Sequence, residues 1–596
     1  MTHLLVIGSP SLDKIHIDGK THHAMGGAGM YMSMAARRAG VDVSMFGPKP
    51  DPMPDALQAL DQRLAEWIGP AIDPALVPRF EISHDGDIAD YLVANIESEQ
   101  EIDPDGFPQY LSKYDGIHIT AMGDAEVQKV FLDMCLARGA KFISIGTWRH
   151  NVEEQAETTR YLIRHSQASF MNEEEAITLF GSIDAAEVHA GHTLFITLAD
   201  KGALVIQGSH RNRIAAKEIA AKDPTGAGEA FCGSVVANLL LEEHPVKAAM
   251  RAVLLAAEKI EGIGPEALLL DAAPPVIPLD ARISLDAAQI EKIAAVVKDL
   301  SDADPFGFVS DYLPPEGHPA ALNFLFAVTF QQFSFWTDKD GKYEAPLIAE
   351  IEGVSRKGSA YMYAAYNRLI DRDPDFFLPA RQAKVTAAEM KHVFRADDGS
   401  DPMPALDLHV EMANAYGRDM LALGLTPAMF VAKAMGAEKP LKTFVEMLDH
   451  VGGYKEDPIR KKSNLLALSV SQRPEKFLRF GDDEIVAPVV DYHCMRAILR
   501  QGLVNVLDED LKNKLAQRML LSEDEEWAIR FAGYRIQEKV EALSGKPIGA
   551  VDWFFFNYTR SHCPEMTDPV CAQCAVDKVC MKRKEMFQPV LRTTYY

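Results

Sequence analysis

The sequence is poor in cysteine, poor in basic residues relative to acidic ones, and free of internal repeats and low-complexity tracts. Its 61 Lys and Arg face 86 Asp and Glu, which gives a net charge of −25. This charge argues against a broad, sequence-independent grip on nucleic acid or on an anionic membrane. The imbalance is −18 over residues 1–280 and only −7 over residues 281–596, so a local cationic groove is expected only in the second part.

The N-terminus lacks a cationic segment before its first apolar run, and that run ends after a few residues. We therefore expect neither a signal peptide nor a membrane helix there, and a cytoplasmic location. The 596 residues contain 47% hydrophobic and 25% charged residues, which is typical of globular proteins. This length exceeds one ordinary core, so at least two domains are expected.

Short β-branched runs alternate with amphipathic helical stretches over residues 1–270. This alternation predicts βαβ units, a mostly parallel sheet, and ligand sites at the carboxyl ends of its strands. The predicted strands are Leu4–Gly8, Val41–Gly47, Gly116–Thr120, Lys141–Gly146, Thr193–Ala199 and Gly202–Gly208. A proline-rich linker is predicted at residues 271–282, because its closely spaced prolines resist both helix and central strand.

Helical periodicity dominates residues 283–596, where strand candidates are few. We predict an all-α second domain. Its clearest helical segments are Asp286–Leu300, Ser359–Leu369, Val385–Phe394, Asp407–Leu423, Pro440–Leu448 and Glu523–Leu543.

A glycine-rich turn, Asp223-Pro-Thr-Gly-Ala-Gly-Glu229, precedes a helical run that reaches Leu241. Two glycines let the backbone approach an anion, and the free N–H groups at a helix start supply donors. Taken alone, the Gly-x-Gly pattern fits an ordinary turn before a helix better than a phosphate site.

The whole segment resembles the Asp-Thr-x-Gly-Ala-Gly-Asp signature of the ribokinase-like (pfkB) sugar and nucleoside kinases. Three further blocks match in order: Gly8–Asp13, Gly26–Gly40 and Asn172–Glu175. The resemblance implies a Rossmann-type α/β fold that transfers the γ-phosphoryl group of ATP, with Mg²⁺, to a primary hydroxyl. It implies a substrate-binding set of Asp13, Gly26, Gly27 and Tyr31, and a cofactor-binding set of Asn172, Glu175, Thr225, Gly226, Ala227 and Gly228.

The resemblance assigns the proton-accepting carboxylate of this transfer to Glu229. Three positions depart from the family pattern. Glu229 replaces Asp, Tyr31 stands where sugar kinases often have Asn, and Ala199 replaces a glycine. An active kinase with altered geometry and a degenerate nucleotide-binding domain both remain open.

Four of the seven cysteines form a compact group near the C-terminus: Cys563, Cys571, Cys574 and Cys580. Four soft ligands on one short loop suit a metal site in a reducing compartment, and their spacing fits zinc or an iron–sulfur cluster. Residues 552–574 resemble the [4Fe–4S] loop of the helix–hairpin–helix base-excision glycosylases, with a first interval longer by one residue. This resemblance implies a [4Fe–4S] cluster, with zinc as the alternative.

Asp491 begins a segment that has an N-cap acid, apolar residues at helical spacing and a terminal glycine at Gly502. The segment resembles the Val-Asp-Thr-His-x-x-Arg of the same glycosylases, whose Asp faces the sugar carbon as the base departs. A fixed carboxylate there would stabilise positive charge on the sugar. Upstream, Arg460–Asn464 resembles the block that carries the Schiff-base lysine of bifunctional glycosylases. Lys462 is thus a candidate nucleophile or a phosphate contact.

Two aromatic blocks, Asn323–Phe326 and Phe333–Trp336, precede Asp491-Tyr492 in an order that resembles the queuosine salvage family. This family releases the base queuine from queuosine 5′-phosphate. The resemblance predicts a helix–hairpin–helix glycosylase-like domain that holds substrate phosphate through Lys461, Lys462 or Arg496. Aromatic side chains stack on bases, so Phe333, Phe335 and Trp336 are candidate base contacts. The alternative is that these aromatic side chains pack in the core.

The two halves together predict a salvage protein that phosphorylates a nucleoside on its 5′-hydroxyl and then hydrolyses the N-glycosidic bond of the nucleotide. The alternatives are a DNA-repair glycosylase with an appended regulatory domain, and a binding protein without chemistry. The acidic charge disfavours DNA as a partner. The expected partner is a small nucleoside or nucleotide, with a homo-oligomer left open.

Overall fold

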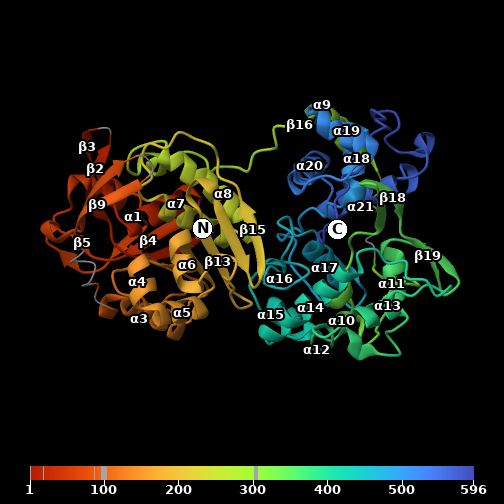
Figure 1. The fold of residues 1–596 in the computed structure, drawn as a ribbon, viewed down its shortest axis with the longest axis horizontal. Helices are drawn as coiled ribbons and strands as arrows, with labels where there is room; N and C mark the ends of the chain where they lie inside the picture. The colour runs from red at the N-terminus through yellow and green to blue at the C-terminus, as the bar shows by residue number, and fades with distance from the viewer. Residues whose placement is uncertain (1, 18, 86–87, 96–101, 103, 301–306) are drawn as a thin grey trace. The chain divides into compact units, whose positions relative to one another are not determined.

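The computed structural model describes residues 2–17, 19–85, 88–95, 102, 104–300 and 307–596 (Figure 1). The chain divides into two compact units, Met1–Ile277 and Pro278–Tyr596. None of the helices in this described part combines the length and apolarity needed to cross a bilayer.

A nine-stranded sheet organises the N-terminal unit. Its strands lie in the order β15-β14-β13-β12-β11-β10-β1-β4-β6, and all neighbours from β13 to β6 pair in parallel. The antiparallel strands β14 and β15 complete one edge. All six strands predicted from the sequence occur. The bounds are β1 His3–Ile7, β4 Asp42–Phe46, β6 Glu66–Ile68, β10 Gly116–Ile119, β11 Ile143–Gly146, β12 Ala168–Asn172, β13 Thr193–Thr197, β14 Ala203–Gln207 and β15 His210–Ile214.

Helices cover both faces of this sheet, and the alternation of strand side chains builds a core on each face. Leu4 and Val6 of β1 pack with α1, α7 and α8, whereas Leu5 and Ile7 pack with α3, α5 and α6 on the other face (Figure 1). The helices are α1 Ala28–Arg38, α2 Gln58–Asp61, α3 Ala125–Ala137, α4 Arg149–Glu154, α5 Ala156–His165, α6 Glu173–Phe180, α7 Ala227–Leu240 and α8 Pro245–Ile260.

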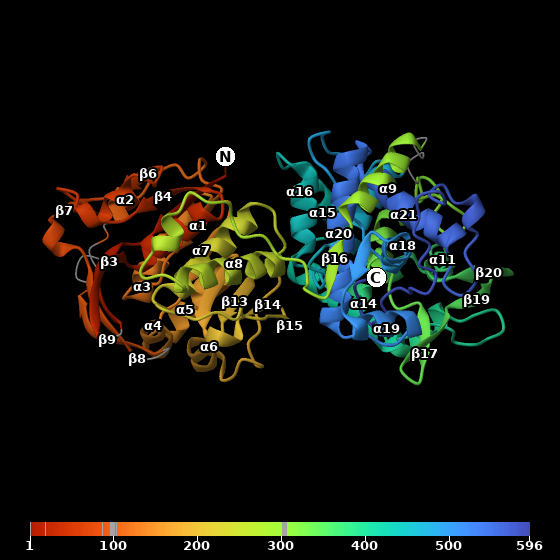
Figure 2. The ribbon, with the colours of Figure 1, turned by 90° about the horizontal axis from the view of Figure 1, so that it is seen from above.

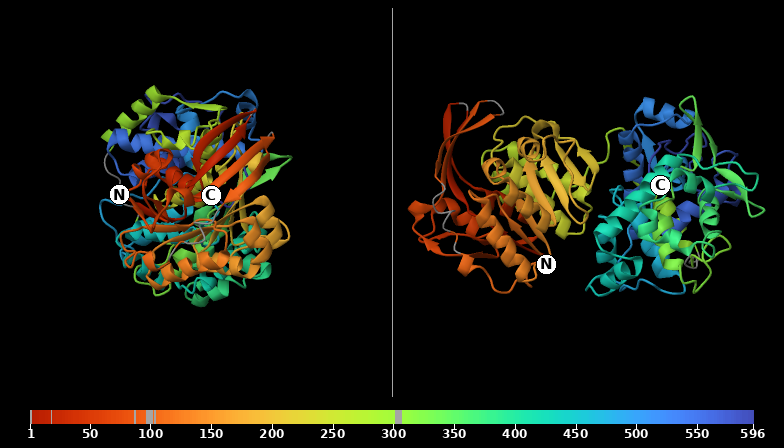
Figure 3. Two further views of the ribbon diagram at one scale, coloured as in Figure 1. Left: turned by 90° about the vertical axis from the view of Figure 1, so that its left-hand side faces the viewer. Right: turned by 60° about the horizontal axis from the view of Figure 1, so that its bottom comes forward.

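A smaller sheet in the order β3-β2-β8-β9 stands at the end of this unit away from β14 and β15 (Figure 3). Its strands are β2 Ser11–Ile17, β3 Lys20–Gly26, β8 Arg79–Asp85 and β9 Ile88–Asn95. A two-residue pair, β5 Lys49–Pro50 and β7 Ala71–Ile72, lies apart from both sheets.

The C-terminal unit is mainly helical, and all six segments predicted as helices are helical. Helices α9, α18, α20 and α21 pack together (Figure 2), while α10 and α12–α17 form a second group. The bounds are α9 Ala287–Asp299, α10 Ala321–Thr329, α11 Ser359–Asn367, α12 Pro379–Gln382, α13 Ala387–Val393, α14 Leu406–Ala422, α15 Pro427–Met435, α16 Pro440–Leu448, α17 Lys461–Gln472, α18 Tyr492–Gln501, α19 Glu509–Gln517, α20 Glu523–Ser544 and α21 Ile548–His562.

The prediction of an all-α unit is wrong in detail, because three two-stranded sheets interrupt the helices. They are β16 Ile283–Leu285 with β21 Val504–Val506, β17 Trp336–Lys339 with β18 Lys342–Pro346, and β19 Ile348–Ile351 with β20 Val354–Lys357. Asp340-Gly341 and Glu352-Gly353 turn two of the hairpins, and all four of these residues have positive φ. An Asp-Gly pair between short strands is a strong local hairpin signal.

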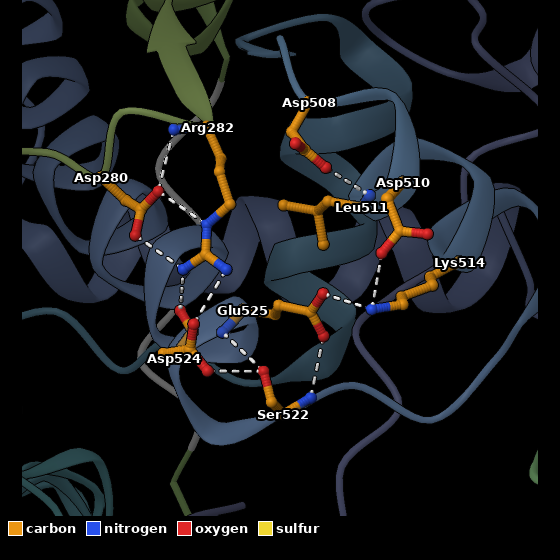
Figure 4. A network of polar contacts seen from close by, with 9 residues as sticks. All are labelled: Asp280, Arg282, Asp508, Asp510, Leu511, Lys514, Ser522, Asp524 and Glu525. Atoms are coloured by element: carbon orange, nitrogen blue, oxygen red, sulfur yellow. Dashed lines mark hydrogen bonds and ion pairs between the residues drawn. The ribbon is translucent and has the colours of Figure 1, made fainter.

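A polar network ties β16 to the start of α20 (Figure 4). Arg282 forms ion pairs with Asp280 at 2.7 Å and with Asp524 at 2.8 Å. Ser522 caps α20, and its amide donates to Glu525 at 2.9 Å in a reciprocal capping box. These contacts fix where α20 begins.

Candidate active sites

A cavity of about 110 Å³ lies at the carboxyl ends of the parallel strands of the N-terminal unit. Thr120 follows β10, Gly146 ends β11, Asn172 ends β12 and Thr197 ends β13, and all four line it. Open parallel sheets place ligands at this edge, because the helices that follow the strands begin there. The sequence predicted a site at this edge.

Asn172 and Glu175 form a capping box at the start of α6. The Asn172 side chain accepts from the Glu175 amide at 2.9 Å, and the Glu175 carboxylate accepts from the Asn172 amide at 3.0 Å and from the Thr147 hydroxyl at 2.8 Å. Burial raises the pKa of Glu175 to about 7, and the nearby charge of Glu229 adds to this rise. The Asn-x-x-Glu spacing therefore brings both side chains to the cavity.

Gly226 begins α7 with φ 73°, and a Cβ there would lie 2.4 Å from the ring of Tyr31. Only glycine fits this left-handed, crowded position. Asp223 fixes the preceding turn by accepting from the Thr225 amide at 3.0 Å, and its backbone carbonyl accepts from the fully buried Lys259 at 2.8 Å. The turn is thus held rigidly beside the cavity.

Glu229 lies in the first turn of α7 and lines the cavity with Gly228. Burial raises the pKa of Glu229, and the charge of Lys259 opposes that rise. The predicted base therefore faces the same cavity as Asn172 and Glu175.

The predicted acceptor-binding residues do not line this cavity. Asp13 is 3% exposed, accepts from the Ser11 hydroxyl at 2.6 Å, and packs against Gly26 so closely that a Cβ would meet its carboxylate. Burial raises the pKa of Asp13 to about 6. Gly27 caps α1 with φ 87°, and Tyr31 is buried against Gly226. The structure thus holds these residues in tight packing.

A much larger cavity, about 710 Å³, lies in the C-terminal unit. It is walled by α17, by the segment that leads to α18, and by α21. Leu465, Leu468, Trp553 and Phe556 supply apolar wall, whereas the polar side chains that converge on it include Asp491, Asp552 and Lys461. An apolar pocket with a few convergent polar groups is typical of small-molecule sites.

Asp491 is the N-cap of α18, as the sequence predicted. One carboxylate oxygen accepts from the amides of His493 at 2.8 Å and Cys494 at 3.0 Å. Its side chain lines the cavity although the residue is only 9% exposed. The cap therefore also fixes the orientation of this carboxylate toward the cavity.

Lys461, and not Lys462, lines the cavity. Lys462 donates to the Gly453 carbonyl at 3.2 Å and lies 4.8 Å from the Phe333 ring centroid, and burial lowers its pKa to about 7. Successive helix positions point about 100° apart, and here Lys461 faces the cavity whereas Lys462 does not. The predicted role of Lys462 stays a prediction.

The aromatic residues predicted to stack on a base are packing residues. Phe333 is fully buried and stacks on His409, with 4.2 Å between the ring centroids. Trp336 stacks on Tyr343, with 5.7 Å between the ring centroids, and Phe335 is 5% exposed. None of Phe333, Phe335 and Trp336 lines the large cavity. These three side chains therefore pack in the core.

Arg496 is also absent from the cavity wall. It is fully buried and donates to the Cys563 carbonyl at 3.0 Å and to the Gln588 side chain at 2.6 Å. A third hydrogen bond, of 2.8 Å, joins its guanidinium group to His493 Nδ1. These contacts occupy its guanidinium group, and its role as a phosphate contact stays a prediction. Lys476, Arg479 and Arg560 line the cavity and are exposed.

Sequence reasoning missed Asp552 as a site residue. It projects from α21 into the same cavity as Asp491, from a position 61 residues later in the chain. A local sequence signal is the acid at the start of an aromatic run, Asp552–Phe556, in a helix that packs on its neighbours.

The four clustered cysteines line a small cavity of about 40 Å³. Arg500 donates to the Cys563 sulfur at 3.2 Å, and burial and the neighbouring thiols raise the pKa of Cys574 and Cys580. Within the described ranges, no three His, Cys, Asp or Glu side chains are arranged as a ready metal site. The thiols thus share one cavity without forming a closed coordination shell.

Comparison with known proteins assigns the two units separately. Residues 94–271 match the family model of pfkB family carbohydrate kinases, and residues 312–573 match that of queuosine salvage proteins. A queuosine 5′-phosphate N-glycosylase/hydrolase of Mus musculus is 24% identical over 281 residues, 43% of this chain and 81% of that protein. A cytidine kinase of Thermococcus kodakarensis is 27% identical over 250 residues, 40% of this chain and 88% of that protein.

Among solved structures, a nucleoside kinase of Burkholderia thailandensis is 18% identical, with a TM-score of 0.38 over 46% of this chain and 95% of that one. The two family models fall on opposite sides of residue 277. The chain is therefore similar to pfkB family carbohydrate kinases in its N-terminal unit and to queuosine salvage proteins in its C-terminal unit.

Proposed function

We propose that the C-terminal unit hydrolyses the N-glycosidic bond of a queuosine-type nucleoside 5′-phosphate, and that the N-terminal unit makes this phosphate from the nucleoside and ATP. The observation that carries the proposal is the fixed carboxylate of Asp491 in a 710 Å³ cavity within the region that matches queuosine salvage proteins. The named activity of the similar mouse protein supplies the substrate class.

The C-terminal cavity has the size and lining that a nucleotide needs. Its volume lies within the roughly 300–1,000 Å³ usual for small-molecule sites. Trp553 and Phe556 offer aromatic wall to a base, and the exposed cations Lys476, Arg479 and Arg560 can pair with a phosphate. Asp491 would stabilise the positive charge that develops on the sugar as the base departs.

The N-terminal cavity fits a nucleotide phosphate with Mg²⁺. Asn172 and Glu175 supply oxygen donors of the kind that Mg²⁺ prefers, and the start of α7 supplies backbone donors beside Gly228. When bound, ATP with Mg²⁺ would supply the transferable phosphoryl group. Glu229 would accept the proton of the attacking hydroxyl.

Replacing Glu229 with Gln is expected to lower phosphoryl transfer to the nucleoside by about 100-fold or more, because the amide cannot accept the hydroxyl proton. ATP binding should persist, since the phosphates are held by the backbone at Gly226–Gly228. Transfer is measured from labelled ATP, and ATP binding by calorimetry. The exposed Glu187→Gln is the matched control. Unchanged transfer in Glu229→Gln would remove this residue from the reaction.

We also propose that Cys563, Cys571, Cys574 and Cys580 bind a metal centre, with a [4Fe–4S] cluster favoured over zinc. Their common cavity and the absence of any disulfide among the described cysteines support the proposal. A tetrathiolate set matches both centres, and closure of the loop around a metal would couple binding to local folding.

Protein purified without oxygen is expected to hold about four irons per chain together with sulfide. Cys571→Ser and Cys574→Ser should lose this metal and destabilise the C-terminal unit, whereas Cys135→Ser, at a buried cysteine in α3, should retain it. Metal analysis and thermal unfolding measure both effects. If metal analysis finds equimolar zinc and no iron, the site is a zinc site and not an iron–sulfur cluster. Absence of both metals would refute the proposal.

A further inference from the structure

We infer that Asp552 is a second catalytic carboxyl group of the C-terminal cavity, which acts as a general acid and protonates the departing base. The inference rests on the proposed glycosidase function and adds a residue to it. Helix α21 packs against α18 and α20, and this packing brings Asp552 into the wall of the cavity that Asp491 lines.

The two carboxyl groups differ in the hydrogen bonds that they receive. Asp491 accepts two backbone N–H groups at 2.8 and 3.0 Å, which are good donors to a carboxylate. Among the residues that the structure describes, Asp552 accepts from Gln537 at 3.5 Å and from the Cys494 thiol at 3.7 Å. These long contacts do little to stabilise a negative charge. The surroundings of Asp552 therefore favour its protonated form.

The charged groups around Asp552 act in the same direction. Burial and the charge of Asp491 raise the pKa of Asp552 to about 8, against smaller opposing effects of Gln537, Lys461 and Cys494. The Cys494 thiol is itself kept neutral, because burial raises its pKa well above the usual value. At neutral pH Asp552 therefore keeps its proton. A buried carboxyl group that is protonated at neutral pH can act as a general acid.

The reaction balances with water as the only co-substrate. The C1′–N bond breaks, its electron pair passes to the base nitrogen, and the proton of Asp552 passes to the base. A water oxygen bonds to C1′ and loses a proton, which restores the acid form of Asp552. Asp491 stabilises the charge on the sugar throughout, and the products are the free base and ribose 5-phosphate.

The test compares two substrates that differ in their need for an acid: queuosine 5′-phosphate, and 4-nitrophenyl riboside 5-phosphate, whose phenolate departs without protonation. We expect Asp552→Asn to lower kcat/KM for the nucleotide by about 100-fold or more, and for the nitrophenyl compound by less than about fivefold. Asp491→Asn should lower both. The control Asp508→Asn, at the N-cap of α19, should change neither.

The pH dependence gives an independent readout. Wild-type kcat/KM for the nucleotide should fall as pH rises through about 8, where Asp552 loses its proton, and Asp552→Asn should lack this alkaline limb. Equal losses on both substrates, or an unchanged limb, would overturn the role of Asp552 while the glycosidase function stands. Absence of cleavage of the nucleotide by the wild type would overturn the glycosidase function and the inference with it. Thermal unfolding confirms that each variant is folded.

Discussion

Replacing Asp491 with Asn is expected to lower N-glycosidic cleavage by about 100-fold or more while the protein remains folded. An Asn side chain retains an oxygen that can accept from the amides of His493 and Cys494, so α18 keeps its cap. The substitution removes the negative charge that stabilises the sugar cation. Release of the base from a nucleoside 5′-phosphate, followed by chromatography, measures the effect.

Asp508 provides the matched control, because it also caps a helix and accepts from the Leu511 amide at 2.8 Å. It does not line the large cavity. Asp508→Asn should therefore leave cleavage unchanged. Its effect on the free energy of unfolding should be as small as that of Asp491→Asn. Wild-type rates in Asp491→Asn would exclude this carboxylate from the mechanism.

Replacing Arg530 with Met is expected to destabilise the C-terminal unit by about 3–5 kcal/mol, because it leaves buried carboxylates without their cation. Arg530 is fully buried and forms ion pairs with Asp457 at 2.6 Å and with Glu526 at 2.8 Å. Asp457 also accepts from the Lys461 amide at 2.8 Å, so the same network holds the start of α17 at the cavity. Cleavage should fall together with stability.

Urea unfolding, followed by a probe in the C-terminal unit, measures this loss, since two units can unfold in separate transitions. Arg535→Met is the control on the same helix. Arg535 is 44% exposed at the side chain and pairs with Glu538 at 3.4 Å, a surface contact that contributes little. An equally small effect for Arg530→Met would show that the buried network does not stabilise the unit.

The regular elements were predictable from the sequence because local patterns determine them. Short β-branched runs identified strands such as β1 and β13, and the N-cap acid with helical spacing identified α18 and its Asp491. The hairpins of β17–β20 were missed, because about half of their side chains are exposed and their strands therefore lack an apolar run. The Asp340-Gly341 and Glu352-Gly353 pairs were the usable signals.

The composition of the C-terminal site was less predictable, since it depends on tertiary packing. The choice between Lys461 and Lys462 depends on the rotation of α17, which begins after Arg460 in a left-handed conformation with φ 56°. Asp552 enters the site from a separate helix, and no local pattern links it to Asp491. The aromatic residues near Phe333 are buried in the structure, and the sequence left both roles open for them because stacking side chains and core side chains have the same composition.

The most direct test of the two-step account is base release by the full-length protein from queuosine alone, queuosine with ATP and Mg²⁺, queuosine 5′-phosphate alone, and a damaged DNA duplex. The account predicts free base from the 5′-phosphate without ATP, free base from the nucleoside only when ATP and Mg²⁺ are present, and none from the duplex. Release from the nucleoside without ATP at the rate of the 5′-phosphate, or release from the duplex alone, would contradict it.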